Sequence, residues 1–259
     1  MRLYVAPRFS TRFLPVYRRN LLVWRKLAVA SVIGNIADPL IILVAFGYGL
    51  GRLLQQVDGV PYIVFLAAGS MCMSTMMAAS FESLYSAFSR MHVQRTWESL
   101  LNAPIELDDI VIAEWLWAAS KSVLSGVAIV SVVWVLGISR EPTLVLALPV
   151  VALTGLVFGA IGLCINALAR GYDFFTYYFT LVLTPMIFLS GVYYPVAELP
   201  AWLAAVAGAL PLAAAVELAR PLVLGKLPTA PLVPLATLLA YAGGALYLAM
   251  ILTRRRFAS

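Results

Sequence analysis

The sequence predicts an all-α integral membrane protein: six transmembrane helices, an N-terminal amphipathic interfacial helix, and external re-entrant helices between spans five and six. Mean hydropathy is +0.94, and 12% of the 259 residues are charged, whereas soluble proteins average about 25%. The apolar runs are long and continuous, unlike the alternating strands of a membrane β-barrel. Because a lipid-exposed backbone must satisfy its own hydrogen bonds, these runs favour helices.

The N-terminal segment, residues 10–34, is predicted to form the amphipathic helix. At 100° per residue, its cations and its large apolar side chains fall on different arcs. The cations are Arg12, Arg18, Arg19, Arg25 and Lys26, and the apolar side chains are Phe13, Tyr17, Leu21, Trp24 and Leu27. We expect this helix to lie in the membrane interface, either as an anchor at anionic headgroups or as a docking surface for a soluble partner.

Six spans follow from the long apolar runs. They are predicted at residues 38–54, 61–88, 109–136, 144–168, 174–192 and 231–252. The first span begins with Asp38 as an N-cap and Pro39 at the first helical position, where the missing N–H costs nothing. Its length of about 25 Å is barely sufficient to cross the hydrocarbon. In the fourth span, the spacing of Gly155 and Gly159 would let another helix approach closely.

The stretch between the last two spans, residues 193–228, fits no crossing. Five prolines cut it into apolar pieces of roughly ten residues, a length that suits re-entrant or interfacial helices. The prolines are Pro195, Pro200, Pro211, Pro221 and Pro228.

The distribution of positive charge predicts that both termini are cytoplasmic. Thirteen of the 18 Lys and Arg residues fall on one side of the predicted spans: Arg2, Arg8, Arg12, Arg18, Arg19, Arg25, Lys26, Arg90, Arg95, Arg170, Arg254, Arg255 and Arg256. The opposite side carries Arg52, Arg140, Arg220 and Lys226. By the positive-inside rule the first side is cytoplasmic, so the re-entrant pieces face outward.

A polar segment separates spans two and three, and we expect residues 94–103 to form a short cytoplasmic helix that ends before Pro104. Helical periodicity gives it an apolar flank and a water-facing flank. The apolar flank holds Trp97, Leu100 and Leu101, and the water-facing flank holds Glu98 and Asn102. Asp108 and Asp109 follow in the first turn of the next helix, where carboxylates interact favourably with the helix dipole. A loop that only turns the chain needs about 2–8 residues, so this helix is expected to contact another molecule.

Three segments together carry a family resemblance. They are RTWESLLNAPIELDDIVIAEWLWAASKSVLSG (95–126), FLSGVYYPVAELPAWL (188–203) and LPLAAAVELARPLVLG (210–225). They closely resemble the membrane subunits of ABC-2 type exporters, and within these the nodulation protein J group, with the permeases that export polysaccharides as more distant relatives. The resemblance covers essentially the whole chain.

The resemblance implies that residues 1–259 form a single ABC-2 transmembrane domain, which is one half of a transporter in the bacterial inner membrane. Two copies are expected to pair with two copies of a separate ATP-binding cassette subunit. The implied substrate is a lipo-oligosaccharide, a glycolipid or a polysaccharide, with a drug or another amphipathic molecule as the alternative. The sequence contains no GxxxxGK[ST] motif, so ATP and Mg²⁺ are expected on the partner subunit and no cofactor on this chain.

By the same resemblance, residues 95–103 are the coupling region, which rests in a cleft of the ATPase. The residues expected to couple ATP hydrolysis to transport are Arg95, Thr96, Trp97, Glu98, Leu100, Leu101 and Asn102. The amphipathic N-terminal helix is expected to flank the same docking surface.

Two further sets of residues are candidates for the transport path. Glu82 and Lys121 lie inside predicted spans at similar depth, where charge is costly; they form either a structural ion pair or a polar contact along the path. Four aromatic residues mark the ends of span five: Phe175, Tyr178, Tyr193 and Tyr194. They belong either to the interfacial belts common in membrane proteins or to a surface on which sugar rings stack.

No catalytic or metal-binding residue is expected, and we expect a transporter subunit rather than an enzyme. The single histidine, His92, lies in a predicted loop, and the sequence contains neither GxSxG nor HExxH. No nucleic-acid partner is expected. The rival interpretation is a membrane scaffold or an ATP-independent secondary carrier, which typically keeps carboxylates and broken helices near the bilayer midplane. Here the interruptions cluster toward the outer face instead.

Overall fold

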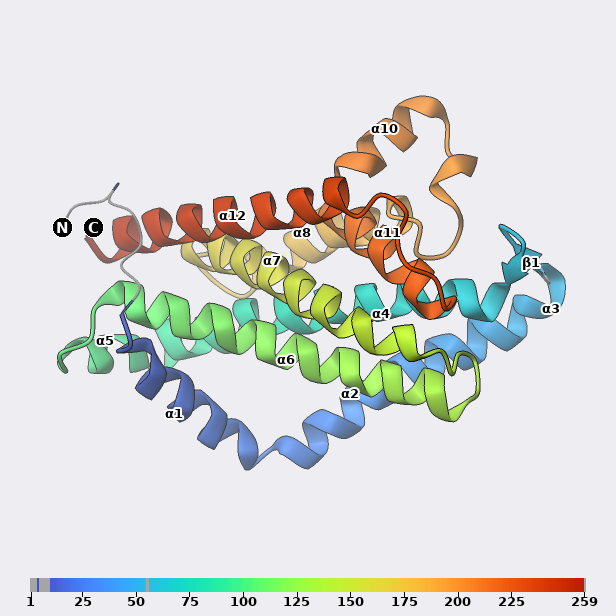
Figure 1. Ribbon diagram of the computed structural model, residues 1–259. Coiled ribbons are helices and arrows are strands. Elements are labelled where there is room, and N and C mark those ends of the chain that lie inside the picture. Colours follow the sequence, from blue (N-terminus) through green and yellow to red (C-terminus); the bar gives the residue numbers. More distant parts are fainter. Residues whose placement is uncertain (1–3, 5–9, 55, 259) are drawn as a thin grey trace.

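The computed structural model describes residue 4, residues 10–54 and residues 56–258, which form an elongated bundle of helices (Figure 1). The α-helices are α1 Phe13–Arg25, α2 Ala28–Ile42, α3 Gly51–Leu54, α4 Tyr62–Phe81, α5 Thr96–Leu101, α6 Leu107–Val135, α7 Ala147–Leu168, α8 Asp173–Tyr178, α9 Thr184–Leu189, α10 Ala201–Ala209, α11 Pro211–Val223 and α12 Leu232–Ala258. Wider π-helical turns occupy Leu43–Tyr48, Glu82–Ser86, Ser89–Val93 and Phe179–Leu183, and 3₁₀ turns occupy Pro142–Leu146 and Val196–Glu198. Strands β1 Gln56–Val57 and β2 Val60–Pro61 pair in antiparallel fashion.

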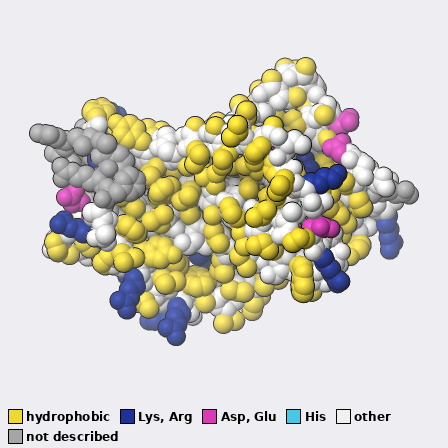
Figure 2. Space-filling model, in the orientation of Figure 1, with side chains coloured by type: hydrophobic (Ala, Val, Ile, Leu, Met, Phe, Trp, Pro, Cys, Tyr) yellow, Lys and Arg dark blue, Asp and Glu magenta, His cyan; other side chains and the backbone are white. Residues whose placement is uncertain are grey.

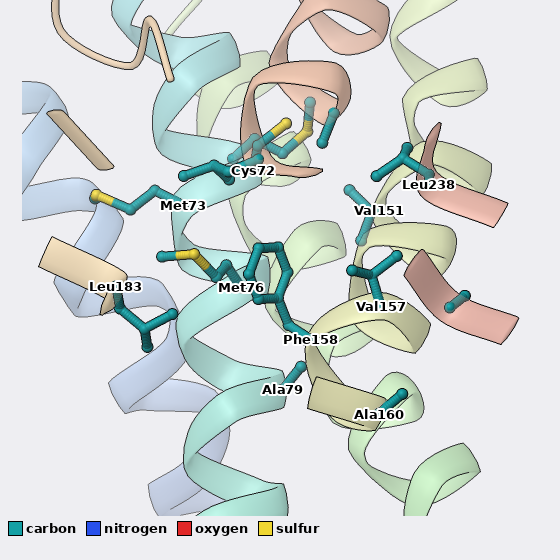
Figure 3. Packing of buried hydrophobic residues seen from close by; sticks show 14 of the residues in the cluster. Cys72, Met73, Met76, Ala79, Val151, Val157, Phe158, Ala160, Leu183 and Leu238 are labelled. Atoms are coloured by element: carbon teal, nitrogen blue, oxygen red, sulfur yellow. The ribbon is translucent and has the colours of Figure 1, made fainter. Parts of the chain in front are cut away.

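Helices α4, α6, α7 and α12 form the centre of the bundle. Helix α7 packs on both α6 and α12, and α4 packs on α6 and α7. Figure 3 shows the packing between α4 and α7, where Met76 and Phe158 lie among other buried apolar side chains. Because α4 is apolar around its whole circumference, it suits a position surrounded by other helices.

Four helical stretches of the described chain are long and apolar enough to cross a membrane. They are Tyr62–Val93, Leu107–Val135, Pro142–Leu168 and Leu232–Ala258. A fifth crossing would need α10 and α11 together, and these two helices meet at a bend of 86°. The helices Leu40–Leu54 and Asp173–Leu189 are apolar but shorter. The chain is therefore a mostly helical, multi-pass membrane protein, while the six-span plan and the re-entrant path of residues 193–228 stay predictions.

Apolar side chains cover much of the surface. In Figure 2 they occupy the middle of the visible face, while many of the visible Lys and Arg side chains lie toward its edges. Several large apolar side chains are more than two-thirds exposed, among them Val29, Leu53, Leu181, Leu232 and Val233. A soluble protein rarely exposes so extensive an apolar surface, whereas a membrane protein presents it to lipid.

The predicted helix start at Asp38 is wrong. Helix α2 already begins at Ala28, so Asp38 and Pro39 lie inside it and cannot cap its N-terminus. The residues upstream of Asp38 are mostly small or apolar and continue the helix, and a proline in a helix interior can kink the helix without ending it. The break falls earlier, at Lys26, which divides the predicted interfacial helix 10–34 into α1 and the beginning of α2.

Gly155 and Gly159 allow α7 to approach α6, as their spacing predicts. A Cβ atom on Gly155 would lie 1.7 Å from Ser122 Oγ and 3.2 Å from Ala119 Cα. A Cβ atom on Gly159 would lie 3.2 Å from the Cβ of Ala118. Small residues at such a contact strengthen helix association because the two backbones can pack closely.

Gly69→Ala is expected to destabilise the protein by about 1–3 kcal/mol. A Cβ atom at Gly69 would lie 2.5 Å from the carbonyl oxygen and 2.7 Å from the Cα of Val192, and neither backbone atom can rotate away. The matched control is Gly243→Ala in α12, where nothing lies within 4 Å of the added atom. Since alanine is the better helix former, the control should be neutral or stabilising. Thermal unfolding of the detergent-solubilised variants measures the contrast, and an unchanged midpoint for Gly69→Ala would contradict it.

Candidate functional site

Helix α5 lies at the end of the bundle where α1 begins and the C-terminus is found (Figure 1). Arg95, just before it, has a φ of +49°, a left-handed conformation that is uncommon for any residue but glycine. It turns the chain from the long helical run ending at Val93 into α5. The ring of Trp97 is 1% exposed and stacks on Phe257 of α12 at 6.1 Å between centroids. Helix α5 is thereby fixed to the core.

The seven predicted coupling residues divide by exposure. Arg95, Glu98 and Asn102 are exposed, Thr96, Leu100 and Leu101 are half-buried, and Trp97 is buried. The apolar flank of α5 packs against the protein's own core. A partner could therefore contact the exposed residues, while the buried Trp97 holds the helix against the core.

Two carboxylates after α5 attach the next helix to distant parts of the chain. Asp109 forms a capping box with Glu106 and also accepts a hydrogen bond from Ser10 Oγ at 2.6 Å. Arg254 of α12 donates two hydrogen bonds to Asp108, from Nε at 2.9 Å and from Nη2 at 2.5 Å. Sequence reasoning assigned these carboxylates only to the helix dipole. The arginines near the C-terminus lie on the same predicted side of the membrane as Asp108. They were the sequence feature that could have indicated Arg254 as its partner.

A largely buried ion cluster lies between the π-helical turns that follow α4 and helix α6. Arg90 donates to Glu114 from Nε at 2.9 Å and from Nη2 at 2.5 Å, and to Glu82 from Nη2 at 2.9 Å. Trp117 Nε1 adds a hydrogen bond of 2.8 Å to the same Glu82 oxygen. Each member of the cluster is therefore both paired and hydrogen-bonded, the condition under which buried charge is tolerated.

Of the two alternatives for Glu82 and Lys121, the direct ion pair is wrong, whereas a polar contact along the path stays a prediction. Glu82 is bonded to Arg90 and Trp117, and Lys121 Nζ donates to Ser31 Oγ of α2 at 2.5 Å. Depth along neighbouring helices is a weak guide, because the direction of each side chain around its helix decides its partner. Sequence reasoning also missed Glu114, which precedes Lys121 by seven residues, about two helical turns, and so shares its face.

The π-helical turns explain how Arg90 reaches Glu82. The two residues are eight apart, which in a regular α-helix separates them by about 80° around the axis. Two π-helical turns, Glu82–Ser86 and Ser89–Val93, cover this part of the chain. A π turn takes up about one residue more than an α turn, so eight residues make close to two turns and both side chains share a face.

A cavity of about 540 Å³ opens beside the ion cluster, between α1, α2, α6 and the π-helical turns that follow α4. It is called the α1–α6 cavity below. Its lining includes Arg19, Asn20, Val23, Trp24, Leu27, Ala30, Ser31, Glu82, Tyr85, Ser86, Ser89, Arg90, Gln94, Trp117 and Lys121. Burial, together with the positive charge of Arg90, lowers the pKa of Arg19 below its usual value. Arginine nevertheless keeps its charge in proteins.

A second hollow of about 340 Å³ adjoins this cavity and shares four lining residues with it: Glu82, Tyr85, Ser86 and Lys121. It extends along α4 to Ser74 and across to Ser125 of α6. Together the two hollows place polar side chains along a large part of an otherwise apolar bundle.

The four predicted path aromatics are not brought together. Phe175 and Tyr178 are buried, and Tyr193 and Tyr194 are half-buried. Phe175 packs edge-on against Tyr85 at 5.3 Å, and the hydroxyl of Tyr193 donates to the sulfur of Met73 at 3.5 Å. In this structure the buried rings face the protein's own core, so they offer no surface to a substrate.

Several aromatic rings that were not predicted as path residues are exposed. Phe81, Tyr172, Phe174 and Tyr177 are each between about four- and seven-tenths exposed. Phe81 and Tyr85 line the second hollow and stack on each other at 5.4 Å. The neighbouring aromatic residues at 174–179 point to both faces of the helix, and the sequence alone does not say which of these faces is buried.

Among the residues that the structure describes, no group of three or more His, Cys, Asp and Glu side chains could hold a metal ion.

Comparison with known proteins identifies the family. The family model described as ABC-2 type transporter matches residues 11–224. The chain belongs to the ABC-2 type transporters. It is 45% identical to nodulation protein J of Rhizobium meliloti (strain 1021) over 261 residues, which cover 98% of each chain. It is 48% identical to nodulation protein J of Rhizobium leguminosarum bv. viciae over 220 residues, 85% of each chain.

A more distant relative is the inner membrane transport permease YadH of Escherichia coli (strain K12), 22% identical over 185 residues, 71% of this chain and 72% of the relative. The resemblance read from three sequence segments is thus confirmed over nearly the whole chain. As an ABC-2 type permease, the protein is a membrane component of a transporter.

Proposed function

We propose that this chain is the membrane-spanning subunit of an ATP-driven exporter in the bacterial inner membrane. Two copies enclose a path and associate with two copies of a separate ATP-binding cassette subunit. Both termini and α5 face the cytoplasm. The orientation is supported by the excess of Lys and Arg at the predicted cytoplasmic side and by the position of α5 at the same end of the bundle as the C-terminus.

The observation that carries the proposal is the way α5 is held. Its exposed residues Arg95, Glu98 and Asn102 are free to contact an ATPase, while Trp97 fixes the helix to α12 through Phe257. A rigidly mounted helix passes a displacement on to the elements that hold it, whereas a flexible loop would absorb it.

Two further contacts extend this connection to other helices. Arg19 of α1 donates a long hydrogen bond of 3.5 Å to Thr96, the first residue of α5. The capping box at Glu106 and Asp109 begins α6 four residues after Asn102. ATP then acts by binding one conformation of the assembly more tightly than another, because only differential affinity shifts such an equilibrium.

For the substrate we propose a lipo-oligosaccharide or another glycolipid. The similarity to nodulation protein J over nearly the whole chain supports this class, and the adjoining hollows combine polar side chains with the exposed ring of Phe81. A polysaccharide is the nearest alternative, and a drug or other amphipathic molecule is a further one. Export assays with these classes in a strain lacking its own permease would separate them.

Co-expression with the cassette ATPase that this proposal requires is expected to yield a stable complex that hydrolyses ATP, whereas the purified chain alone hydrolyses none. The matched control is the same ATPase with an inactivated phosphate-binding loop, which should assemble but not hydrolyse. Failure to co-purify with such an ATPase would contradict the proposal. Export that stops on addition of a proton ionophore while ATP stays high would favour a secondary carrier instead.

A further inference from the structure

The C-terminal end of α12 is the part of that helix most enclosed by the rest of the protein. Between residues 231 and 248, α12 turns an exposed face outward, on which Leu232, Val233 and Leu239 are more than half exposed. Residues 249–254 are instead buried or half-buried on every side of the helix. Charged side chains are rarely buried unless they are paired, so the arginines at this end of α12 are held by specific partners.

The side chains at this end contact three different helices. Arg254 binds the first turn of α6, Phe257 stacks on the buried tryptophan of α5, and Arg256 binds α7. At about 100° per residue, these three side chains point in different directions around α12. Arg255 occupies the remaining direction; it is exposed and contacts Tyr4 instead.

Arg256 caps the C-terminus of α7. Its Nη1 donates hydrogen bonds to the carbonyl oxygens of Asn166 at 2.8 Å and Ala167 at 3.0 Å. These carbonyl groups belong to the last turn of α7, where regular intrahelical partners are missing and where a cation meets the negative end of the helix dipole. The same guanidinium lies 5.9 Å from the centroid of the Phe88 ring and contacts His92, in the chain leading to α5.

The capped end of α7 is in turn bound to the π-helical turn that carries Glu82. Asn166 Nδ2 donates a hydrogen bond of 2.8 Å to the carbonyl oxygen of Ser83. A Cβ atom on Gly162, one turn earlier in α7, would lie 1.9 Å from Ser83 Oγ, so the two elements touch directly. The neighbouring Glu82 lines both the α1–α6 cavity and the hollow beside it. A continuous series of contacts therefore runs from α5 to the lining of these hollows.

We propose that Arg256 is a positioning residue, which ties α5 to the end of α7 and so passes a movement of α5 on to the turn that carries Glu82. The inference rests on the proposed function, in which α5 receives that movement from an ATPase. The contacts within this chain do not depend on the ATPase, so the link can be measured without it. A position between two sites does not by itself establish coupling, and the experiments below measure the coupling directly.

Hydrogen exchange of the purified full-length chain in detergent tests the link. Arg256→Met keeps an apolar stem but removes the donors, and amide exchange is expected to rise about threefold or more in α5, in the last turn of α7 and in the turn Glu82–Ser86. Arg255→Met is the matched control, because it removes the same charge on the exposed side of the helix, and it should leave exchange in these segments unchanged. Faster exchange confined to α12 would overturn the proposal.

Two further variants keep this test decisive. Phe257→Leu removes the ring that stacks on Trp97 but leaves the cap on α7, so exchange should rise in α5 and stay unchanged at the end of α7. An equal rise at both places would show general loosening and contradict the series of contacts. If Arg256→Met does not give monodisperse protein, Arg256→Gln keeps one donor group and is expected to raise exchange in the same segments to a smaller extent; no rise would overturn the proposal.

The role in transport is measured as export per ATP hydrolysed by the complex with the ATPase. Arg256→Met is expected to lower this ratio about fivefold or more, whereas Arg256→Lys, which restores the charge and the donors, should keep at least half of it. A structural defect alone would lower hydrolysis and export together, so an unchanged ratio would overturn the positioning role. If the unmodified chain forms no complex that hydrolyses ATP, the proposed function fails, and the exchange experiment still decides whether Arg256 joins α5 to α7.

Discussion

Arg90→Met is expected to destabilise the protein by about 3–5 kcal/mol. The substitution removes the cation that holds Glu82 and Glu114, and it leaves two carboxylates facing each other in a buried site. Without that cation the two carboxylates repel each other and the cost of burying them is no longer offset, which disturbs the packing of the turn Glu82–Ser86 against α6. The loss is measured as a lower thermal midpoint and a smaller monodisperse fraction in detergent.

A triple variant provides the control for this prediction. Replacing Arg90 by Met together with Glu82→Gln and Glu114→Gln removes all three charges at once. Because a whole buried ion cluster can often be replaced by neutral residues at little cost, the triple variant is expected to regain most of the lost stability. The Trp117 N–H keeps an acceptor in the amide oxygen that replaces the Glu82 carboxylate. A triple variant as unstable as Arg90→Met would show that the ion cluster is not the cause.

Glu98→Lys is expected to reduce export by about tenfold or more without lowering the amount of protein in the membrane. Glu98 is exposed on α5, so reversing its charge leaves the fold intact. In the proposed interface with an ATPase, however, a reversed charge would meet groups arranged for a carboxylate, and such juxtapositions cost several kcal/mol. Export of the proposed substrate, a labelled lipo-oligosaccharide, by cells that also produce the proposed ATPase partner gives the measurement.

The matched control is Glu198→Lys, the same charge reversal at an exposed residue near α10, in the predicted external region. It should leave export within about twofold of the original protein. Trp97 is unsuitable for this test because it is buried, and its loss would disturb α5 as a whole. Normal export by both Glu98→Lys and Asn102→Lys would remove the coupling role from α5.

Much of the fold was predictable because it depends on properties that are local in sequence. Long apolar runs identify the central helices, and the proline after Ala103 marks the end of the region that contains α5. The family could be recognised because three segments occur together. The exposure of Glu98 and Asn102 follows from helical periodicity alone, since α5 is short and regular.

The partners of the buried charges were not predictable, because they depend on how helices are rotated against each other. Lys121 donates a hydrogen bond to Ser31, 90 residues away in the sequence, and Arg254 donates to Asp108, 146 residues away. The start of this helix was predicted too late because Asp38 and Pro39 resemble a helix N-terminus, although the mostly small or apolar residues before them continue the helix. The inward direction of Phe175 and Tyr178 likewise depends on the packing of Tyr85 and its neighbours.

The π-helical turns after α4 constrain how this sequence can change in evolution. Seven residues separate Glu82 from Arg90, and the wide turns bring both ends of that interval to one side of the helix. Deleting a single residue within the interval would rotate Arg90 by about 100° relative to Glu82 and break the cluster, although every charged residue would still be present. Homologues that retain the three charged residues should therefore also retain the number of residues between Glu82 and Arg90. A homologue with a deletion in this interval is expected to have lost the ion cluster.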